Sequence, residues 1–491
     1  MSPATKKPTL LQAFIPIFFL VIFLVLNVYF FGDDTLSGAN QIALLLAASI
    51  AGIIATLLGL KWKSILESIV KSISSAMPAI LILLLIGSLA GTWLLSGVVP
   101  AMIYYGLKIL NPGIFLFATV VICCLVSLAT GSSWSTIATI GIALIGIGSA
   151  LGISEGIVAG AIISGAYFGD KMSPLSDTTN LAPAMAGTDL FTHIRYMVYT
   201  TAPSIIITLI IFFILGFTYD FKDGTTDVKD VLLAIEKTFN ITPILFLVPA
   251  LLIFIIIKKV PPLPSLLAGT LLGGLFAIIF QPSIIEQISE VKNNYMEASF
   301  IAVMKSMFGE IGIITENKSV NDLLSTRGMA GMLNTIWLIL AAMTYGGAME
   351  SAGLLIRISH AVIKYAKSTG GLVTSTVLTC LFFNVTASDQ YIAIVVPGRM
   401  FAKTYKNRGL KPEVLSRALE DSGTVTSVLI PWNTGGATQA RVLGVPTLTY
   451  VPYAFFNIIS PLMSMFMAYF NIKIRRFKNN NKDNGSPNYS S

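Results

Sequence analysis

Long apolar stretches alternate with short polar connections along most of the chain. A helix needs about 20 apolar residues to cross the hydrocarbon core of a bilayer, so each long stretch predicts a membrane-spanning helix. These stretches are residues 13–31, 41–60, 77–97, 113–129, 203–219, 242–258, 262–281, 330–350 and 371–385. The pattern therefore predicts an all-α polytopic membrane protein.

Other apolar segments are interrupted by Gly, Pro, Ser, Thr and acidic residues. They are residues 135–169, 173–199, 389–403 and 412–470. Backbone that leaves the helical conformation at membrane depth is tolerated only where protein buries it or where it lines a cavity. We therefore expect broken helices and re-entrant hairpins here, which brings the expected total to about 10–14 crossings.

Lysine and arginine clusters predict the orientation of the helices, because cytoplasmic loops carry the excess of positive charge. The clusters are Lys6 and Lys7; Lys61, Lys63 and Lys71; Lys258 and Lys259; Arg357, Lys364 and Lys367; and Lys473, Arg475, Arg476 and Lys478. The acidic or balanced segments 32–40, 220–241 and 282–329 then lie on the opposite side, with 282–329 as an extramembrane segment. We expect both termini in the cytoplasm, as an N-terminal segment 1–12 and a basic, disordered tail 471–491.

Composition excludes several classes of protein. Of the 491 residues, 54% are apolar and 11% are charged, which excludes a soluble fold. The net charge of +8 lies in the loop clusters, so we expect contact with lipid and no nucleic-acid partner. The cysteines and the two histidines, His193 and His360, lack metal-ligand spacing, so we expect no cofactor and no metal other than a transported ion. Nothing in the sequence specifies an oligomeric state.

The predicted orientation divides the chain into two inverted repeats, residues 13–241 and 242–470, because helix 13–31 runs outward and helix 242–258 runs inward. Residues of the two halves match at a nearly constant offset. The matches include Gly91 with Gly347, Gly97 with Gly353, Thr130 with Thr386, Pro174 with Pro431 and Gly187 with Gly444. Chance matching of two membrane-like compositions is the alternative, but shared Gly, Pro and Thr positions favour the repeat. Secondary transporters use inverted repeats for alternating access.

Acidic residues inside apolar segments are costly and mark candidate functional positions. They are Asp170, Asp177, Asp389, Glu420 and Asp421. Pro174 disfavours helical geometry at the preceding residue, so we expect a helix break between the first two acids. The oxygen-bearing residues that we expect to bind an ion there are Asp170, Ser173, Ser176, Asp177 and Thr178. A hard cation such as sodium requires oxygen ligands; a polar extramembrane loop is the alternative.

The second half carries a comparable set of residues around Pro431, which predicts a matching helix break. The candidate ion-binding or coupling residues there are Asn384, Thr386, Asp389, Asp421, Thr424, Asn433 and Thr434. Thr130, Ser132 and Ser133 match the turn at 386–389, so the two turns predict the tips of re-entrant hairpins. Glu420 and Asp421 point about 100° apart on a helix, so we expect one of them to meet the ion and favour Asp421. We expect both halves to face one cavity.

Two motifs give a specific resemblance. Residues 169–179 (GDKMSPLSDTT) and 430–435 (IPWNTG) resemble the signatures of the NhaC-type sodium/proton antiporter family, within a larger ion-transporter superfamily. The resemblance implies a secondary transporter of the plasma membrane that exchanges cytoplasmic sodium for external protons. Its physical core is a buried carboxylate that binds either a proton or sodium.

The same family contains malate/lactate exchangers, so an ion-coupled organic-acid exchanger is the second reading. An organic acid would require a cationic partner; the candidates are Lys171, which could also pair with an aspartate or reach an interface, and Arg441. Lithium is a further candidate substrate. A channel would not need acids on broken helices in two inverted halves, and a membrane enzyme would need a nucleophile, metal or phosphate site that the sequence lacks.

Overall fold

The computed structural model describes residues 6–31, 38–109, 111–218, 228–315, 321, 324–358 and 368–477. His360, Lys364, Lys367 and the predicted tail from position 478 onward lie outside these residues. The first part of that tail, residues 471–477, is ordered, contrary to the prediction. Its backbone pairs with residues 409–411, where the Lys411 amide donates to the Arg475 carbonyl oxygen and the Phe477 amide to the Gly409 carbonyl oxygen.

The described part of the chain is helical except for loops and one antiparallel pair of two-residue strands. The helices of the first half are α1 (Leu10–Phe31), α2 (Ala39–Leu57), α3 (Trp62–Leu95), α4 (Val98–Ile109), α5 (Pro112–Thr130), α6 (Ser133–Thr136), the π-helix η2 (Ile137–Gly141), α7 (Ile142–Ala150), α8 (Glu155–Met172), α9 (Asp177–Ala186), α10 (Leu190–Thr218) and α11 (Val228–Thr238).

The second half begins with a short 3₁₀ turn and again consists mostly of helices. Its elements are η3 (Pro243–Phe246), α12 (Leu247–Ile257), α13 (Pro262–Phe280), α14 (Pro282–Ser289), α15 (Tyr295–Phe308), β1 (Ile311–Gly312), β2 (Ser325–Thr326), η4 (Ala330–Met332), α17 (Leu333–Ser351), α19 (Thr369–Thr386), α20 (Gln390–Asn407), α21 (Pro412–Leu419), the π-helix η5 (Glu420–Thr424), η6 (Ser427–Leu429), α22 (Thr434–Leu443), α23 (Thr447–Tyr450), η7 (Val451–Tyr453) and α24 (Phe455–Tyr469).

The helices are long and apolar enough for a polytopic membrane protein, as predicted. Within the described residues, nine helices could cross a membrane by length and composition, or up to eleven if each of two bent pairs forms one span. The bent pairs are α11 with η3 and α12, at 92°, and α23 and η7 with α24, at 56°. Large apolar side chains such as Phe18, Tyr29 and Phe30 of α1 are exposed, as expected where lipid is the solvent.

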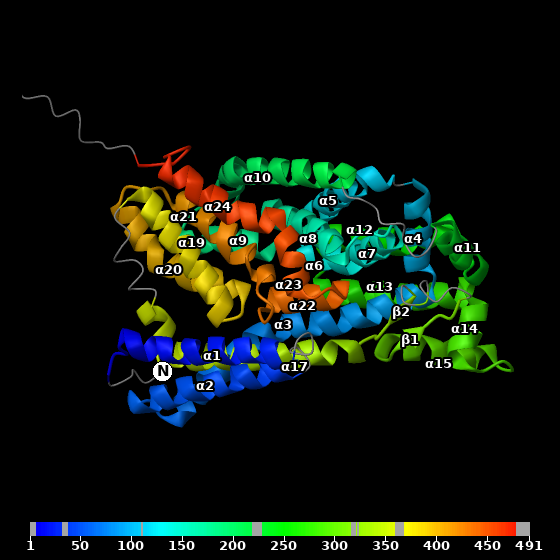
Figure 1. Ribbon diagram of the computed structural model, residues 1–491, viewed down its shortest axis with the longest axis horizontal. Helices are drawn as coiled ribbons and strands as arrows, with labels where there is room; N and C mark the ends of the chain where they lie inside the picture. The colour runs from blue at the N-terminus through cyan, green and yellow to red at the C-terminus, as the bar shows by residue number, and fades with distance from the viewer. Residues whose placement is uncertain are drawn as a thin grey trace, which may run out of the picture.

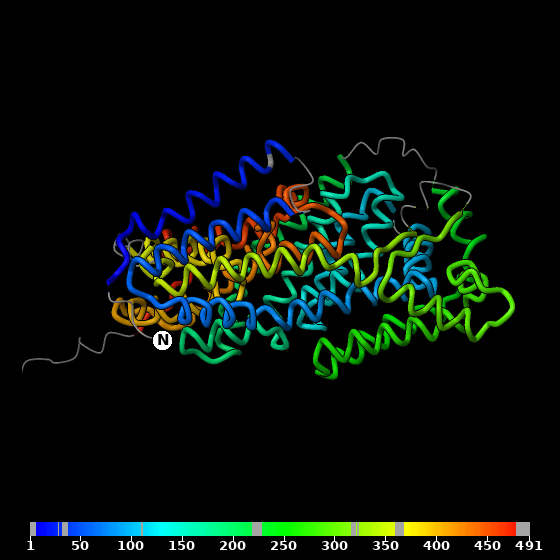
Figure 2. The backbone as a smooth tube through the Cα atoms, turned by 90° about the horizontal axis from the view of Figure 1, so that it is seen from below, coloured from blue at the N-terminus to red at the C-terminus, as the bar shows by residue number. Residues whose placement is uncertain are grey.

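The molecule is elongated, and most helices follow its long axis (Figures 1 and 2). α11, α14, α15 and the two strands gather at one end, whereas α19, α20, α21 and the last described residues lie at the other. α17 packs along α2 and α3 on one face, and α10 packs against α24 on the opposite face. Three apolar clusters form the core, and the largest runs through α5, α7 and α8.

Two helices begin earlier than the hydropathy pattern indicates. The apolar stretches predict spans at 77–97 and 203–219, but α3 begins at Trp62 and α10 at Leu190. Polar residues such as Lys63 and Glu67 are good helix formers, so the helix continues beyond the apolar stretch. The predicted extramembrane segment 282–329 also contains two helices, α14 and α15.

A broken helix occupies the first motif, as the position of Pro174 predicts. α8 ends at Met172, Ser173 is extended with ψ 132°, and α9 begins at Asp177. The Ser176 side chain caps α9 by accepting a hydrogen bond from the Thr179 amide. The Thr179 hydroxyl donates to the carbonyl oxygens of Asp170 and Lys171, both at 2.9 Å, which satisfies acceptors at the end of α8.

The second half repeats this arrangement 257 residues later, where α21 begins at Pro412 and α22 spans Thr434–Leu443, against Glu155 and Asp177–Ala186 in the first half. A left-handed glycine ends both α9 and α22, namely Gly187 and Gly444. The start of α8 lies against Thr449, just beyond α22, and α9 packs against α21. The two broken helices are therefore antiparallel, as inverted repeats require.

Two helical hairpins approach the breaks from opposite ends of the molecule (Figure 1). In the first hairpin, α5 forms one arm, and α6, η2 and α7 together form the other. Its tip is at Gly131 and Ser132. The other consists of α19 and α20, with its tip at residues 387–389. Gly131 lies against the backbone at Leu175 and Ser176, and the Thr434 amide donates to the Ser388 carbonyl oxygen at 2.9 Å. Each tip thus contacts the break of its own half.

Candidate ion-binding site

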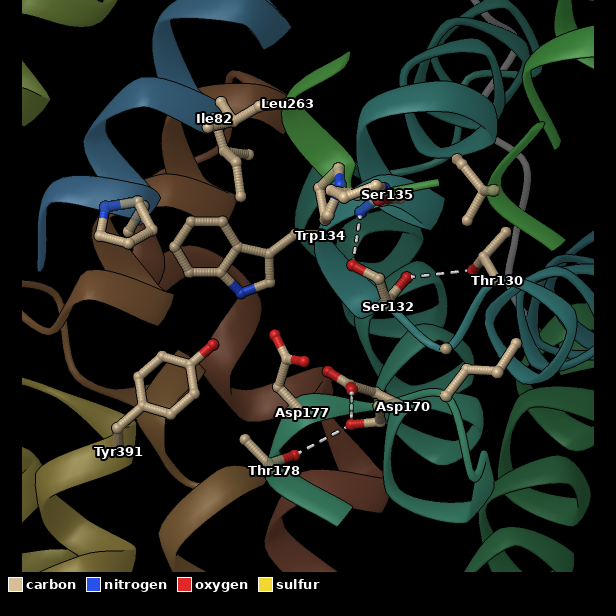
Figure 3. Close-up of a pocket in the computed structure, with 18 of the residues that line it drawn as sticks. Ile82, Thr130, Ser132, Trp134, Ser135, Asp170, Asp177, Thr178, Leu263 and Tyr391 are labelled. Atoms are coloured by element: carbon tan, nitrogen blue, oxygen red, sulfur yellow. Dashed lines mark hydrogen bonds between the residues drawn. The ribbon is translucent and has the colours of Figure 1, made fainter. Parts of the chain in front are cut away.

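A cavity of 1010 Å³ lies where the two hairpin tips meet the two helix breaks (Figure 3). Its polar lining comes from both halves of the chain and includes Thr130, Ser132, Ser135, Asp170, Ser176, Asp177, Thr178, Asp389, Gln390 and Thr434. Apolar side chains of α3 and residues 260–264 complete the wall. Carboxylates that lie far apart in the sequence therefore line the same cavity.

Asp170 is the most firmly held of the cavity carboxylates. It is 6% exposed at the end of α8. The Ser133 hydroxyl donates to its Oδ2 atom and the Ser176 hydroxyl to its Oδ1 atom, both at 2.6 Å. These are charge-assisted hydrogen bonds from the hairpin tip and from the helix break, so both elements fix the position of this carboxylate.

Asp177 is the exposed carboxylate of the cavity. It is the first residue of α9, where the positive end of the helix dipole favours an acid. In Figure 3 its carboxylate lies beside Asp170 and points to the space between the Trp134 and Tyr391 rings. An accessible carboxylate beside the more enclosed Asp170 can attract a cation from the cavity before the cation loses its remaining water.

Asp389 supplies a carboxylate from the second half. It caps α20 by accepting hydrogen bonds from the amides of Tyr391 and Ile392, at 2.9 and 3.0 Å through Oδ1. The side chain is buried and also lines the cavity. The two helix amides bind one of its oxygen atoms, and the side chain of Thr434, another cavity residue, also interacts with the carboxylate.

The remaining predicted residues hold the breaks together. The Asn433 side chain donates to the carbonyl oxygen and the side-chain oxygen of Asn384, at 2.9 and 3.1 Å. Asn384 in turn donates to the Gly423 carbonyl oxygen. Thr386 donates to its own helix, Ser173 accepts from the Leu175 amide, and Thr424 is buried. None of these five residues is among those that line the large cavity.

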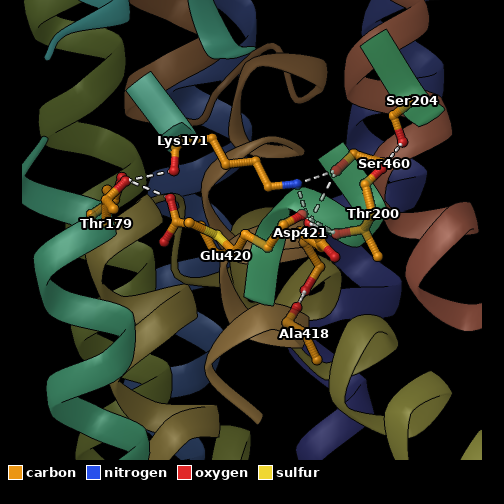
Figure 4. A network of polar contacts seen from close by, with 11 residues as sticks. Lys171, Thr179, Thr200, Ser204, Ala418, Glu420, Asp421 and Ser460 are labelled. Carbon is orange, nitrogen blue, oxygen red and sulfur yellow. Dashed lines mark hydrogen bonds and ion pairs between the residues drawn. The ribbon is translucent and has the colours of Figure 1, made fainter. Parts of the chain in front are cut away.

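The two adjacent acids of η5 take different partners (Figure 4). Asp421 forms an ion pair with Lys171, and both side chains are fully buried. Ser460 contacts both members of the pair, and Thr200 donates to Asp421. Glu420 instead accepts a hydrogen bond from the cavity residue Thr178 at 3.0 Å. Of the two acids, Glu420 therefore has the direct contact with the cavity wall.

Sequence reasoning assigned one cavity residue to another role. Lys259 lines the large cavity, although its position in a basic cluster suggested only a topological role. Arg441 lines a separate cavity of 420 Å³ with Arg327 and Glu155. Trp134, Gln390 and Tyr391 also line the large cavity; their position immediately after the hairpin tips was the signal that could have identified them.

A membrane-spanning chain with carboxylates and hydroxyls at the junction of two broken helices and two hairpins is a transporter rather than an enzyme. Its oxygen-rich site suits a small hard cation. The chain belongs to the Na⁺/H⁺ antiporter family, whose sequence profile matches residues 3–166 and 165–472.

Curated relatives cover most of the chain. It is 37% identical to the Na(+)/H(+) antiporter NhaC of Bacillus subtilis (strain 168), over 84% of this chain and 88% of the relative. It is 35% identical to the NhaC protein of Alkalihalophilus pseudofirmus, over 88% of this chain and 91% of the relative. It is also 37% identical to the malate-2H(+)/Na(+)-lactate antiporter of Bacillus subtilis, over 90% and 91%.

Proposed function

We propose that this chain exchanges cytoplasmic sodium for external protons, with Asp170, Asp177 and Asp389 as the groups for which the two ions compete. The observation that supports this most directly is the convergence of these three carboxylates, from both halves, on one cavity. Similarity to NhaC antiporters supports the same substrates. Lithium, which also prefers oxygen ligands, is the closest competing cation.

Competition at one set of carboxylates couples the two ions when the site changes its access only while an ion occupies it. A carboxylate oxygen that holds a proton cannot also coordinate sodium, so the loaded site carries one ion or the other. Asp170 receives two hydroxyl hydrogen bonds in the structure, and sodium would replace their hydrogen atoms as the partner of the carboxylate. The serine oxygens, with their lone pairs, can then turn toward the ion.

We further propose that the two inverted repeats, residues 13–241 and 242–470, move relative to each other during transport. The antiparallel broken helices and opposed hairpin tips support this, because movement of one repeat can close the cavity on one side and open it on the other. The proposed location is the plasma membrane. The basic clusters support an orientation in which both termini lie in the cytoplasm.

The test is sodium flux in proteoliposomes driven by a pH gradient. Asp170→Asn and Asp389→Asn keep the side-chain volume but remove the titrating charge, so we expect exchange to fall to background in both. Asp189→Asn is the matched control, because Asp189 caps α10 at the surface, where its Oδ1 accepts from the Thr192 amide. Near-normal exchange by both cavity variants would contradict the proposal.

Organic-acid exchange is the second candidate function, and two observations favour it. The cavity volume of 1010 Å³ exceeds what one cation needs, and Lys259 supplies a cationic group in the wall. A relative of similar identity is named for malate and lactate. Flux with and without malate or lactate separates the candidates: organic-acid exchange requires sodium flux to depend on the acid and to fall in Lys259→Gln.

A further inference from the structure

Glu420 is a fully buried acid that lies behind the wall of the large cavity and is not part of its lining. Its Oε1 atom accepts from the Thr178 hydroxyl, and its Oε2 atom has no hydrogen-bond partner. The Thr424 hydroxyl, one turn further on, is also buried and interacts with the Glu420 side chain. A charged carboxylate is costly in such surroundings unless a cation or a proton accompanies it.

Among the residues that the structure describes, two buried cations come near Glu420 in the chain or in the fold, and each has another contact. Arg417, three residues earlier, lies over the Tyr196 ring, 4.3 Å from its centre. Asp170 and Lys171 of α8 are the charged groups that interact with it electrostatically. Lys171 is already paired with Asp421, the residue next to Glu420. The Lys171–Asp421 pair is neutral as a unit, and Asp170 carries the same sign of charge as Glu420. A proton is therefore the remaining partner for Glu420.

Side-chain contacts connect Glu420 with Asp170. They form a continuous chain of hydrogen bonds when one of the two carboxyl groups carries a proton, because each hydroxyl has a single hydrogen to donate. The Thr178 hydroxyl lies 3.2 Å from the Ser176 hydroxyl, and the Ser176 hydroxyl donates to Asp170 Oδ1 at 2.6 Å. The Thr178 hydroxyl donates to Glu420 Oε1 at 3.0 Å. Two hydroxyl groups in series, each of which can donate and accept, form a path for a proton between two carboxylates. The path crosses from the first half of the chain to the second.

We propose that Glu420 is a second proton-carrying group of the transporter and that Ser176 and Thr178 conduct its proton to and from the cavity. In the transfer, protonated Asp170 gives its proton to Ser176, Ser176 passes its own to Thr178, and Thr178 passes its own to Glu420. Asp170 ends as a carboxylate, Glu420 ends protonated, and the two hydroxyl groups are regenerated. The reverse sequence returns the proton to the cavity.

This inference rests on the proposed function and extends it to the number of protons per sodium ion. Sodium beside Asp170 repels a proton on Glu420, because only the Ser176 and Thr178 hydroxyl groups lie between the two carboxyl groups. The sodium-loaded transporter then carries no proton on Glu420, whereas the sodium-free transporter carries protons on both Asp170 and Glu420. Each cycle moves one proton more than the cavity carboxylates alone would move.

The experiment measures the reversal potential of sodium-dependent current in proteoliposomes, which gives the ratio of protons to sodium. In Glu420→Gln we expect the ratio to fall by one proton and the apparent sodium affinity to fall with it, because the carboxylate that is unprotonated in the sodium-loaded transporter no longer attracts the ion. In Thr178→Val we expect an unchanged ratio but turnover lower by roughly tenfold or more, since a methyl group interrupts the path.

Thr208→Val is the control, because the buried Thr208 hydroxyl donates to the Ser204 carbonyl oxygen within α10, away from the cavity. It should change neither the ratio nor the turnover. A wild-type ratio in Glu420→Gln would overturn the inference. If that variant does not fold, wild-type turnover in Thr178→Val would overturn it instead. Absence of sodium-dependent proton flux in the wild-type protein would refute the proposed exchange itself, which is a different outcome.

Discussion

At the scale of single residues, the fate of a buried charge depends on its partner. Asp170 is stabilised by hydroxyl groups, Asp389 by helix amides, and Asp421 by a lysine. Only the lysine brings a full opposite charge. The three acids share a residue type and a polar setting in the sequence, yet among the described residues the structure pairs Asp421 with a lysine and gives the other two only uncharged partners.

The Lys171–Asp421 pair yields a prediction about stability. Removing one partner of a buried ion pair leaves an uncompensated charge, which costs about 3–5 kcal/mol. We expect Lys171→Met to lower the thermal unfolding temperature of the purified protein markedly. The double variant Lys171→Met with Asp421→Leu removes both charges and should recover most of the loss. If Lys171→Met alone were as stable as the wild type, the pair would not hold the two halves together.

At the scale of elements, the tip of the first-half hairpin packs closely against the helix break of the same half. Gly131 has φ 70° and ends α5, and a Cβ atom there would lie 2.5 Å from the Leu175 Cβ atom and 2.8 Å from its carbonyl carbon. Glycine is therefore required twice, for the left-handed backbone and for the close approach. The contact places Ser133 and Ser176 on either side of Asp170.

Gly131→Ala should therefore separate the tip from the break and weaken sodium binding. Gly187 is the matched control: it also ends a helix in the left-handed conformation, at φ 86°, but nothing lies within 4 Å of its would-be Cβ atom. Both alanines pay a left-handed strain of about 1–2 kcal/mol. Sodium-dependent protection from proteolysis should fall in Gly131→Ala only; an equal fall in Gly187→Ala would assign the effect to strain.

The helix breaks could be predicted from the sequence because proline acts locally. Pro174 determines the geometry of its own neighbour, and the observed break at 173–176 follows. The contribution of Lys259 could not be predicted in this way. It depends on how the α12–α13 turn packs against the middle of α3, which is decided by side chains almost two hundred residues apart. The pairing of Lys171 with Asp421 depends on tertiary packing for the same reason.

At the scale of the whole molecule, different helices lie at the two ends of the long axis. α11 and α14 lie at one end, and the end of α20 lies at the other with the last described residues (Figure 1). The charge pattern predicts that the second end faces the cytoplasm. The two ends should therefore be accessible from opposite sides of the membrane.

Cysteine labelling of intact cells tests this orientation in a background without the three native cysteines. Single cysteines at Asp230 and Glu286, both exposed, should react with an impermeant reagent added outside. Cysteines at the exposed Lys63 and Lys406 should react only after the cells are opened. Reaction of all four positions from the same side would contradict the predicted topology and the inverted arrangement that depends on it.

In the proposed exchange, sodium and protons compete for carboxylates supplied by both halves of the chain. The most direct measurement is proton release into a weakly buffered solution when sodium is added to the purified protein. We expect proton release from the wild-type protein, and its loss both in Asp170→Asn from the first half and in Asp389→Asn from the second. Unchanged proton release in both variants would show that the ions bind elsewhere and would contradict the shared site.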